Sequence, residues 1–266
     1  MTHNPKSPIG IYDSGVGGLT VLRRLRAQLP GEDIIYFGDS ANCPFGNRSR
    51  HELSAITARI FGFFRSRGVK LTVSACNTTS ALFQLEGEPD CGFKLLSIIE
   101  PIARQLARLN LEDVGVIATE FTVNSGMYEK LIHKESPDTR VWGQGSASLA
   151  RLVDTGCFAG DEIPVEVHRL TGELLARKAL SHIILACTHY PIVDEEFMRA
   201  APDVTFLDPA AAQAAATSEL LAEQGLLNPQ AMGRLEVYTS GEPELFKAMA
   251  DRLGIEGIDR VEKLVL

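Results

Sequence analysis

Short apolar runs that alternate with amphipathic helical stretches constrain the fold of this chain most strongly. The apolar run at 9–12 leads into the glycine-rich turn DSGVGG, and leucines at helical spacing follow until Pro30 and Gly31. Because helical stretches lie between most of the apolar runs, the pattern predicts an α/β fold with mostly parallel sheets and helices on both faces. The other predicted strands lie at 33–37, 69–75, 93–98, 114–118, 183–186, 204–207 and 235–238.

Local signals also place the ends of several predicted helices. Ser49, with Glu52 three residues later, forms a capping-box pattern that predicts the start of a helix. Gly68 is the residue at which this helix is expected to end. The alanine-rich run at 210–216 predicts a further helix by propensity.

The size and charge of the chain argue against several classes of protein. With 266 residues it is a little under two average domains, and its formal net charge of −8 disfavours a large nucleic-acid-binding face or an anionic membrane surface. The first residues show no signal-peptide pattern, and no apolar stretch approaches the roughly 18 residues that span a bilayer. We therefore expect a soluble, cytoplasmic protein that binds neither nucleic acid nor membrane.

The five cysteines argue against a disulfide framework, because their number is odd and they form no CxxC pair. The same spacing disfavours a structural zinc site. In a reducing compartment each cysteine is by default a small, buried and unreactive residue. The cysteines stand at positions 43, 76, 91, 157 and 187.

Two of these cysteines stand in similar settings. The segments VKLTVSACNTTS and SHIILACTHYP each read as a buried strand that runs into Ala-Cys and then into small polar residues. Open α/β sheets bind their ligands at the carboxyl ends of the strands, which is where both cysteines are expected. The pattern predicts two similar α/β halves that each contribute one cysteine, Cys76 and Cys187, to a shared cleft.

The neighbours of the two cysteines suit acid–base chemistry. A thiol near the amino terminus of a following helix has its thiolate favoured by unpaired N–H groups. His189, two residues after Cys187, can exchange a proton with that thiol or hold its charge. Asp13, between the first strand and its glycine turn, is the corresponding candidate on the Cys76 side. Hydrogen bonds to a carboxylate ligand are expected from Asn77, Thr78 and Thr188.

Two other interpretations of these motifs are open. The turn DSGVGG has the glycines of an anion-binding turn, but it fits neither the Walker A pattern nor G-x-G-x-x-G. Cys187 and His189, together with Cys76 or Cys43, are residue types that bind zinc, which is the basis of a zinc-hydrolase alternative.

The motifs DSGVGG, YFGDS with PFG, ACNT and CTHYP, in this order, resemble those of the cofactor-independent aspartate/glutamate racemase family over about residues 9–208. The resemblance implies two α/β domains related by a pseudo-twofold axis, with the active site between them. One domain is then formed by residues 1–97 plus 208–266, and the second, inserted domain by 98–207.

The resemblance also implies a chemistry, the interconversion of L- and D-glutamate without a cofactor or a metal, which supplies D-glutamate for peptidoglycan. Cys76 and Cys187 then act as two bases on opposite faces of the substrate, with Asp13 assisting the first and His189 the second. We expect their sulfurs to face each other across one cleft, too far apart for a disulfide. The small-molecule amino-acid substrate is then held by Asp13, Ser14, Phe45, Gly46, Asn77, Thr78, Thr188 and His189.

The chain departs from the family pattern at three places. Phe45 stands where the family usually has tyrosine, Cys76 is followed by NTTS instead of NTAT, and Asp154 ends a segment from 141 that is less apolar and usually ends in glutamate. A racemase for aspartate or another amino acid, and a binding protein that has lost activity, therefore stay open as alternatives. The oligomeric state, including a homodimer, is open as well.

Overall fold

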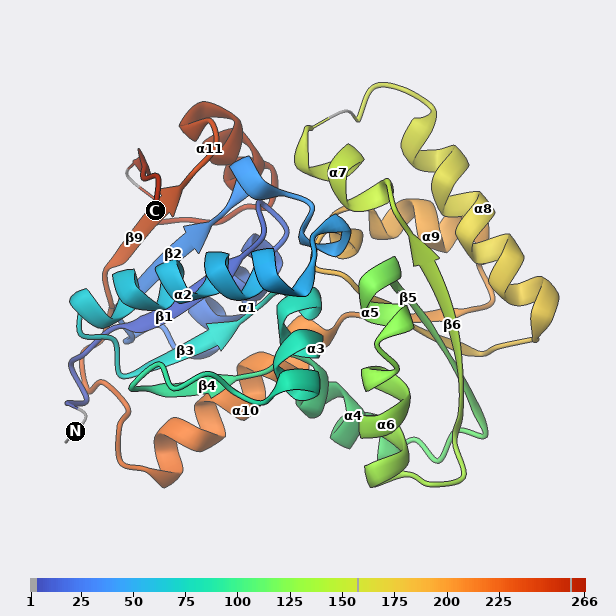
Figure 1. Cartoon of the computed structure of the whole chain (residues 1–266), viewed down its shortest axis with the longest axis horizontal. Helices are drawn as coiled ribbons and strands as arrows, with labels where there is room; N and C mark the ends of the chain where they lie inside the picture. The colour runs from blue at the N-terminus through green and yellow to red at the C-terminus, as the bar shows by residue number, and fades with distance from the viewer. Residues whose placement is uncertain (1–3, 157, 259) are drawn as a thin grey trace.

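The computed structural model describes residues 4–156, 158–258 and 260–266, which form two lobes, each built on its own β-sheet (Figure 1). All strand pairs described in both sheets are parallel, and helices flank the sheets. The predicted α/β fold with mostly parallel sheets is therefore confirmed. Cys157, one of the five cysteines, lies outside the described residues.

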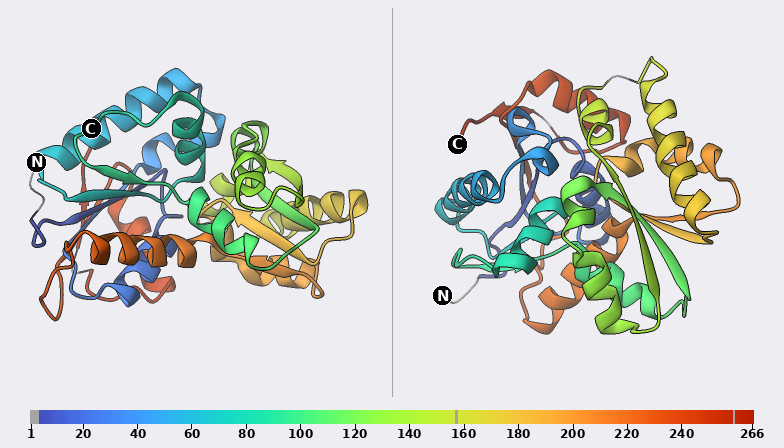
Figure 2. Two further views of the ribbon diagram at one scale, coloured as in Figure 1. Left: turned by 90° about the horizontal axis from the view of Figure 1, so that it is seen from below. Right: turned by 45° about the vertical axis from the view of Figure 1, so that its right-hand side comes forward.

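The sheet of the first lobe combines strands from both ends of the chain. Within the described residues it has six strands in the order β10-β9-β2-β1-β3-β4, so that the late strand β9 pairs with β2. Figures 1 and 2 show the carboxyl end of the chain in this lobe, beside the early strands. The strands are β1 (Ile9–Asp13), β2 (Ile34–Gly38), β3 (Leu71–Ser74), β4 (Lys94–Leu96), β9 (Leu235–Thr239) and β10 (Val261–Lys263).

The sheet of the second lobe is formed by a continuous middle part of the chain. Among the described residues its four strands have the order β6-β5-β7-β8. These strands are β5 (Asp113–Thr119), β6 (Arg140–Ser146), β7 (His182–Ala186) and β8 (Thr205–Leu207).

Helices connect the parallel strands in both lobes. The first lobe carries α1 (Leu19–Gln28), α2 (Arg50–Ser66), α3 (Asn77–Glu86), α10 (Pro209–Glu223), α11 (Pro243–Arg252) and the 3-10 turns η1 (Ser40–Asn42) and η2 (Phe45–Asn47). The second part of the chain forms α4 (Ile99–Ala107), α5 (Glu120–Asn124), α6 (Met127–Glu135), α7 (Leu149–Asp154), α8 (Glu162–Arg177), α9 (Asp194–Ala200) and the 3-10 turn η3 (Tyr190–Val193). None of the helices in the described parts of the chain has the length and apolarity to cross a bilayer.

The local signals of the sequence explain several of these boundaries. Ser49 and Glu52 form the predicted capping box at the start of α2, and Gly68 follows its end with a positive φ of 66°. Two strands were not predicted. β6 contains two glycines and is only partly buried, and β10 has three residues at a sheet edge, so neither shows an apolar run.

The carboxyl ends of the central strands of the two sheets meet where the lobes join. The hydroxyl of Thr188, just after β7, donates to Asp13 at the end of β1. Thr78, in the first turn of α3, lies 3.1 Å by its hydroxyl from that of Thr119 at the end of β5. The strand-end motifs singled out in the sequence are therefore brought together by the packing of one lobe on the other.

Candidate active site

Asp13 lies at the end of β1 with its carboxylate surrounded by donors. Its Oδ2 accepts from the backbone N–H groups of Gly18 at 2.9 Å and Gly15 at 3.3 Å, and the Thr188 hydroxyl donates to Oδ1 at 3.1 Å. A glycine is needed at position 18, because a Cβ there would lie 2.5 Å from the Cβ of Asp13 and from the hydroxyl of Tyr36. The glycine-rich turn therefore places N–H groups around a carboxylate of the chain itself.

Burial dominates the electrostatics of Asp13. Its side chain is fully buried, and desolvation raises the pKa of the carboxyl group. The charge of His189 and the hydrogen bonds from Gly18, Gly15 and Thr188 oppose this rise without cancelling it.

Cys76 follows β3 as the N-cap residue of α3 and is 4% exposed. The pKa of its thiol is raised to about 12, first by burial and then by the negative charge of Asp13 and, to a smaller extent, of Cys187. Contacts from Thr79 lower the pKa in part. Cys76 therefore holds its proton at neutral pH in the free protein.

A buried hydroxyl network lies under Cys76. The Thr79 hydroxyl lies 3.2 Å from the Cys76 carbonyl oxygen and accepts a hydrogen bond from the Tyr12 hydroxyl at 3.0 Å. The hydroxyl oxygen of Ser74 lies 2.8 Å from that of Tyr12 and 3.0 Å from that of Ser80. Thr79 and Ser80 are the two residues after Cys76 that depart from the family pattern. Both therefore belong to this buried network, in which their hydroxyls have hydrogen-bond partners.

Cys187 directly follows β7, and its surroundings differ from those of Cys76. Its Sγ lies 3.8 Å from Nδ1 of His189, and Nε2 of the same ring lies 3.1 Å from Oδ1 of Asp154. Oδ1 of Asp154 also accepts from the Val16 N–H at 2.8 Å, which ties α7 of the second lobe to the glycine turn of the first. Close packing again requires glycine, because a Cβ at Gly17 would lie 2.6 Å from Nδ1 of His189.

His189 is fully buried, yet its pKa is raised well above the ordinary value. Desolvation lowers the pKa, but the hydrogen bonds to Asp154, Cys187 and Cys43 outweigh it. The imidazole is therefore held in its charged form by acidic neighbours on two sides.

Polar groups suited to a carboxylate ligand gather beside the two thiols. The Asn77 side-chain oxygen accepts from the Tyr128 hydroxyl at 2.6 Å, while its Nδ2 is buried and has no hydrogen-bond partner among the described residues. An unpaired buried donor destabilises a protein by about 1–3 kcal/mol, so this amide is a candidate for ligand binding.

The structure brings most of the predicted site residues to one buried region. Asp13, Ser14, Cys76, Asn77, Thr78, Cys187, Thr188 and His189 are all buried. Phe45 is buried too, and Gly46 lies against the Thr119 side chain, where a Cβ would approach to 2.6 Å. The sequence predicts a shared cleft at this place; the described side chains are packed together and closed from solvent.

Several residues of the site were not predicted. Tyr128 and Thr119 carry no motif, and only the end of a predicted strand marks the second. Asp154 was noted as a replacement for glutamate, but its contact with His189 joins residues 35 positions apart and has no local pattern.

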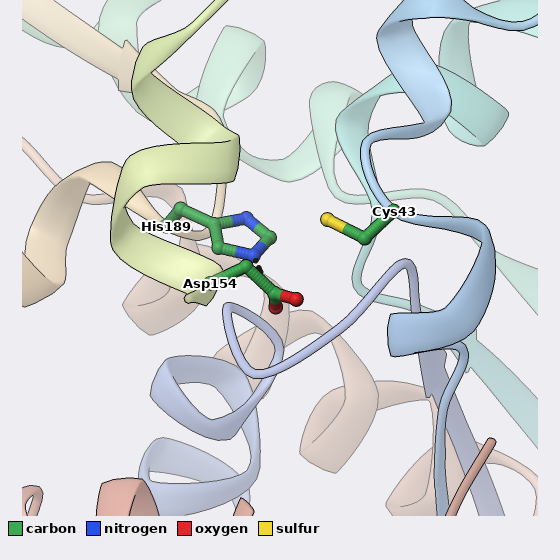
Figure 3. Close-up of side chains that lie close together, drawn as sticks. All are labelled: Cys43, Asp154 and His189. Atoms are coloured by element: carbon green, nitrogen blue, oxygen red, sulfur yellow. Dashed lines mark hydrogen bonds and ion pairs between the residues drawn. The ribbon is translucent and has the colours of Figure 1, made fainter. Parts of the chain in front are cut away.

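Cys43 lies on the other side of the His189 ring from α7. Figure 3 shows its sulfur directed toward the imidazole, with the carboxylate of Asp154 beside the ring. Burial raises the pKa of the Cys43 thiol to about 11, although His189 lowers it in part. Cys43, Cys76, Cys91 and Cys187 are all free thiols.

The fold and the strand-end motifs are those of a class of amino-acid racemases. A sequence model for Asp/Glu/Hydantoin racemases matches residues 16–217, and the chain belongs to this family. It is 40% identical over 253 residues to the glutamate racemase of Herpetosiphon aurantiacus, which covers 94% of this chain and 98% of that protein. This confirms the resemblance predicted from the motifs and the prediction of an amino-acid racemase.

Solved structures agree with the sequence comparison. A glutamate racemase isoform from Bacillus anthracis matches with a TM-score of 0.90 and 30% identity over 99% of both chains. The glutamate racemase of Francisella tularensis, determined in complex with D-glutamate, matches with a TM-score of 0.83 and 31% identity over 98% of both chains. The chain thus resembles these proteins over nearly its whole length.

Proposed function

We propose that this chain is a glutamate racemase that interconverts L- and D-glutamate with two cysteine bases and no cofactor. The observation that carries the proposal is the pair of buried free thiols, Cys76 and Cys187, each within two residues of the end of an inner strand of its own sheet. The charge of Cys187 also contributes to the raised pKa of Cys76, which supports a short separation between the two.

The reaction balances with these two groups alone. From L-glutamate, the sulfur of Cys187 takes the α-proton, and the electron pair of the broken C–H bond remains on the planar α-carbon. Cys76 then delivers its thiol proton to the opposite face, and D-glutamate leaves with Cys187 protonated and Cys76 ionised. Proton exchange with water, assisted by Asp13 and His189, restores the starting state.

Polar groups near the thiols suit the charge that develops in this reaction. Proton removal shifts negative charge onto the α-carboxylate, where fixed hydrogen-bond donors are most effective in a dry site. Asn77 offers its unpartnered Nδ2 and Thr78 its hydroxyl at the same strand end, and the Thr188 hydroxyl, which donates to Asp13 in this structure, would turn from Asp13 to the substrate. We assign the substrate carboxylate to these donors, with Ser14, Phe45 and Gly46 closing the site.

The two lobes are proposed to be domains of residues 1–97 plus 208–266 and of residues 98–207. Support comes from the sheets, since β9 and β10 pair in the first sheet and β5 to β8 form the second. Because the candidate residues are buried between the lobes, substrate access requires the lobes to separate. Binding of glutamate is then coupled to closure, which excludes water from the reacting carbon.

In this proposal the enzyme acts in the cytoplasm and supplies D-glutamate for peptidoglycan, as the family resemblance implies. Its direct partner is the amino acid itself.

Circular dichroism of L-glutamate, D-glutamate and L-aspartate solutions incubated with the dialysed protein tests the function. Both glutamate enantiomers should decay to the same racemic end point without added cofactor. In D₂O the product should carry deuterium at Cα while unreacted substrate keeps hydrogen, because different thiols remove and deliver the proton. Faster racemisation of aspartate would replace the substrate assignment. An unchanged signal with all three would favour a catalytically silent binding protein.

A further inference from the structure

We propose that Cys43, Asp154 and His189 form an inhibitory site for a divalent transition metal such as Zn²⁺, which holds the two lobes closed. One ligand atom from each residue, a thiol sulfur, a carboxylate oxygen and an imidazole nitrogen, lies within 4.8 Å of the other two. Figure 3 shows the Cys43 sulfur directed toward the His189 ring and the Asp154 carboxylate beside that ring.

The spacing is close to that of a metal site. Zinc bonds of about 2.0–2.3 Å in tetrahedral geometry place ligand atoms about 3.3–3.6 Å apart. The His189 Nε2 and Asp154 Oδ1 atoms are already 3.1 Å apart. A small movement of the partly exposed Cys43 side chain therefore completes a three-ligand set, and a water molecule can take the fourth position.

The ligand types select the metal. A thiolate and a carboxylate together neutralise the charge of a divalent ion, so the occupied site can be buried without a net charge. Sulfur and nitrogen ligands favour Zn²⁺ or Co²⁺, whereas Mg²⁺ and Ca²⁺ prefer oxygen ligands. The thiol proton of Cys43 and one ring proton of His189 are released to water when the metal binds.

Occupation of this site has two consequences. Cys43 lies in the first lobe between η1 and η2, whereas Asp154 ends α7 and His189 follows β7 in the second lobe. A metal bound to all three tethers the lobes in the closed arrangement, which blocks substrate access. It also occupies a His189 nitrogen, so that the imidazole can no longer exchange a proton there. Only the inhibition rests on the proposed function; the metal binding does not.

Metal binding is tested directly by titrating the purified, metal-free protein with Co²⁺ and Zn²⁺. Co²⁺ bound to Cys43 should give a thiolate-to-metal charge-transfer band, and Zn²⁺ should displace it, while Mg²⁺ should have no effect. Cys43→Ser keeps the shape of the side chain but replaces the soft ligand with a poor one. It should abolish the band and weaken zinc affinity at least about tenfold.

Two further variants locate the site. Cys91→Ser makes the same change at a buried thiol whose sulfur lies 3.3 Å from the Phe93 carbonyl oxygen, outside the cluster, and should bind Co²⁺ like the parent. Cys76→Ser should also keep the band. The proposal is overturned if the parent shows no band, if Cys43→Ser keeps it, or if Cys76→Ser loses it.

The racemisation assay gives the second readout. Zn²⁺ should inhibit the parent and Cys91→Ser at the concentrations that displace Co²⁺, and Cys43→Ser should resist inhibition by the same factor as its loss of affinity. Equal inhibition of the parent and Cys43→Ser would contradict the inhibitory role. If no variant racemises glutamate, the proposed function fails, while the cobalt spectra still decide whether the metal site exists.

Discussion

The two cysteine sites of this molecule share their backbone position but differ in electrostatics. Cys76 and Cys187 each follow an inner parallel strand, and both are buried. Cys76 faces the carboxylate of Asp13, whose negative charge helps to raise its pKa to about 12. Cys187 lies 3.8 Å from the imidazole of His189, which Asp154 helps to keep protonated. Like strand ends can therefore carry opposite neighbouring charges.

This difference assigns starting roles in the proposed reaction. In the free protein Cys76 carries a proton, as an acid should, while the sulfur of Cys187 lies beside the charged imidazole of His189. Because the enantiomers have equal free energies in water, the ratio kcat/KM must be equal in the two directions. The difference between the two cysteines must therefore be measured in reactions that need only one proton abstraction, and in the pH titration of each thiol.

The largest effects are expected from replacing one thiol at a time. Cys76→Ser and Cys187→Ser should each lower racemisation by at least about 10³-fold, because every turnover uses both groups and serine is a much weaker acid. Elimination from a β-chloro analogue needs only one proton abstraction. Cys76→Ser should therefore keep elimination from the L analogue, and Cys187→Ser from the D analogue, as measured by release of chloride.

Cys91→Ser is the control for these variants, because it removes a buried thiol outside the site. Equal loss of elimination from both enantiomers in both variants, with the fold intact by circular dichroism, would refute separate bases. Full racemase activity in either variant would remove that cysteine from the mechanism.

Removal of the negative charge beside Cys76 should lower the pKa of this thiol and yet slow racemisation. In Asp13→Asn the pKa of Cys76 should fall below about 12, because the charge of Asp13 is the second-largest cause of the rise after burial. Racemisation should nevertheless slow by about 10²- to 10³-fold, since the group that accepts the thiol proton is lost. The pH dependence of Cys76 alkylation, resolved by mass spectrometry, measures the first effect.

Asp39→Asn provides the matched control, because Asp39 is a buried carboxylate that accepts from Ser240 and Asn42 instead of facing the thiol. It should leave the titration of Cys76 unchanged. A Cys76 pKa that stays constant in Asp13→Asn would show that Asp13 does not act on this thiol.

At the Cys187 site, Asp154→Asn should lower the pKa of His189. Its hydrogen bond to Asp154 is the largest cause that opposes desolvation, so without it the titration moves to lower pH. The limb of the kcat/KM profile that reports His189 should shift the same way, and activity at neutral pH should fall by about 10²-fold. Exposed Glu195 on α9 gives the control Glu195→Gln, which should leave the profile in place.

The same variant has a signature in stability. A raised pKa in the folded protein stabilises it fully below the unfolded pKa of about 6.5, and this contribution is lost as pH rises through the folded pKa. Asp154→Asn should therefore destabilise the protein more at pH 6 than at strongly alkaline pH in urea unfolding. A loss that is independent of pH would mean that Asp154 contributes only packing.

The sequence was sufficient for the parts of this comparison that are local. Parallel strands put their carboxyl ends at one edge of a sheet, so Cys76 and Cys187 could be placed from apolar runs and the residues that follow them. The contact of Asp154 with His189 depends instead on how α7 packs against η3 and on the glycine turn of the other lobe. Strand β6, which leads to α7, has two glycines and no apolar run, so nothing local indicated its course.

The hydroxyl of Thr79 gives the smallest predicted effect and acts on one site alone. Its hydrogen bonds lower the pKa of Cys76 in part, and it links the Cys76 carbonyl to the Tyr12 hydroxyl. In Thr79→Ala the backbone N–H contact remains while the hydroxyl is lost, so the pKa of Cys76 should rise further. Tyr12 keeps Ser74 as a partner, which limits the loss of stability to about 1 kcal/mol.

Because the hydroxyl of Thr79 is only the smaller of the two causes that lower the pKa of Cys76, we expect kcat to fall by no more than about two- to fivefold. The alkylation profile of Cys76 should move to higher pH, while the profile of Cys187 and the His189 limb of the kcat/KM profile stay unchanged. Thr79→Ser restores the hydroxyl without the methyl group and should recover the parent profile. If Thr79→Ala shifts both thiols equally, the two sites share one electrostatic environment, and the contrast between them would have to be abandoned.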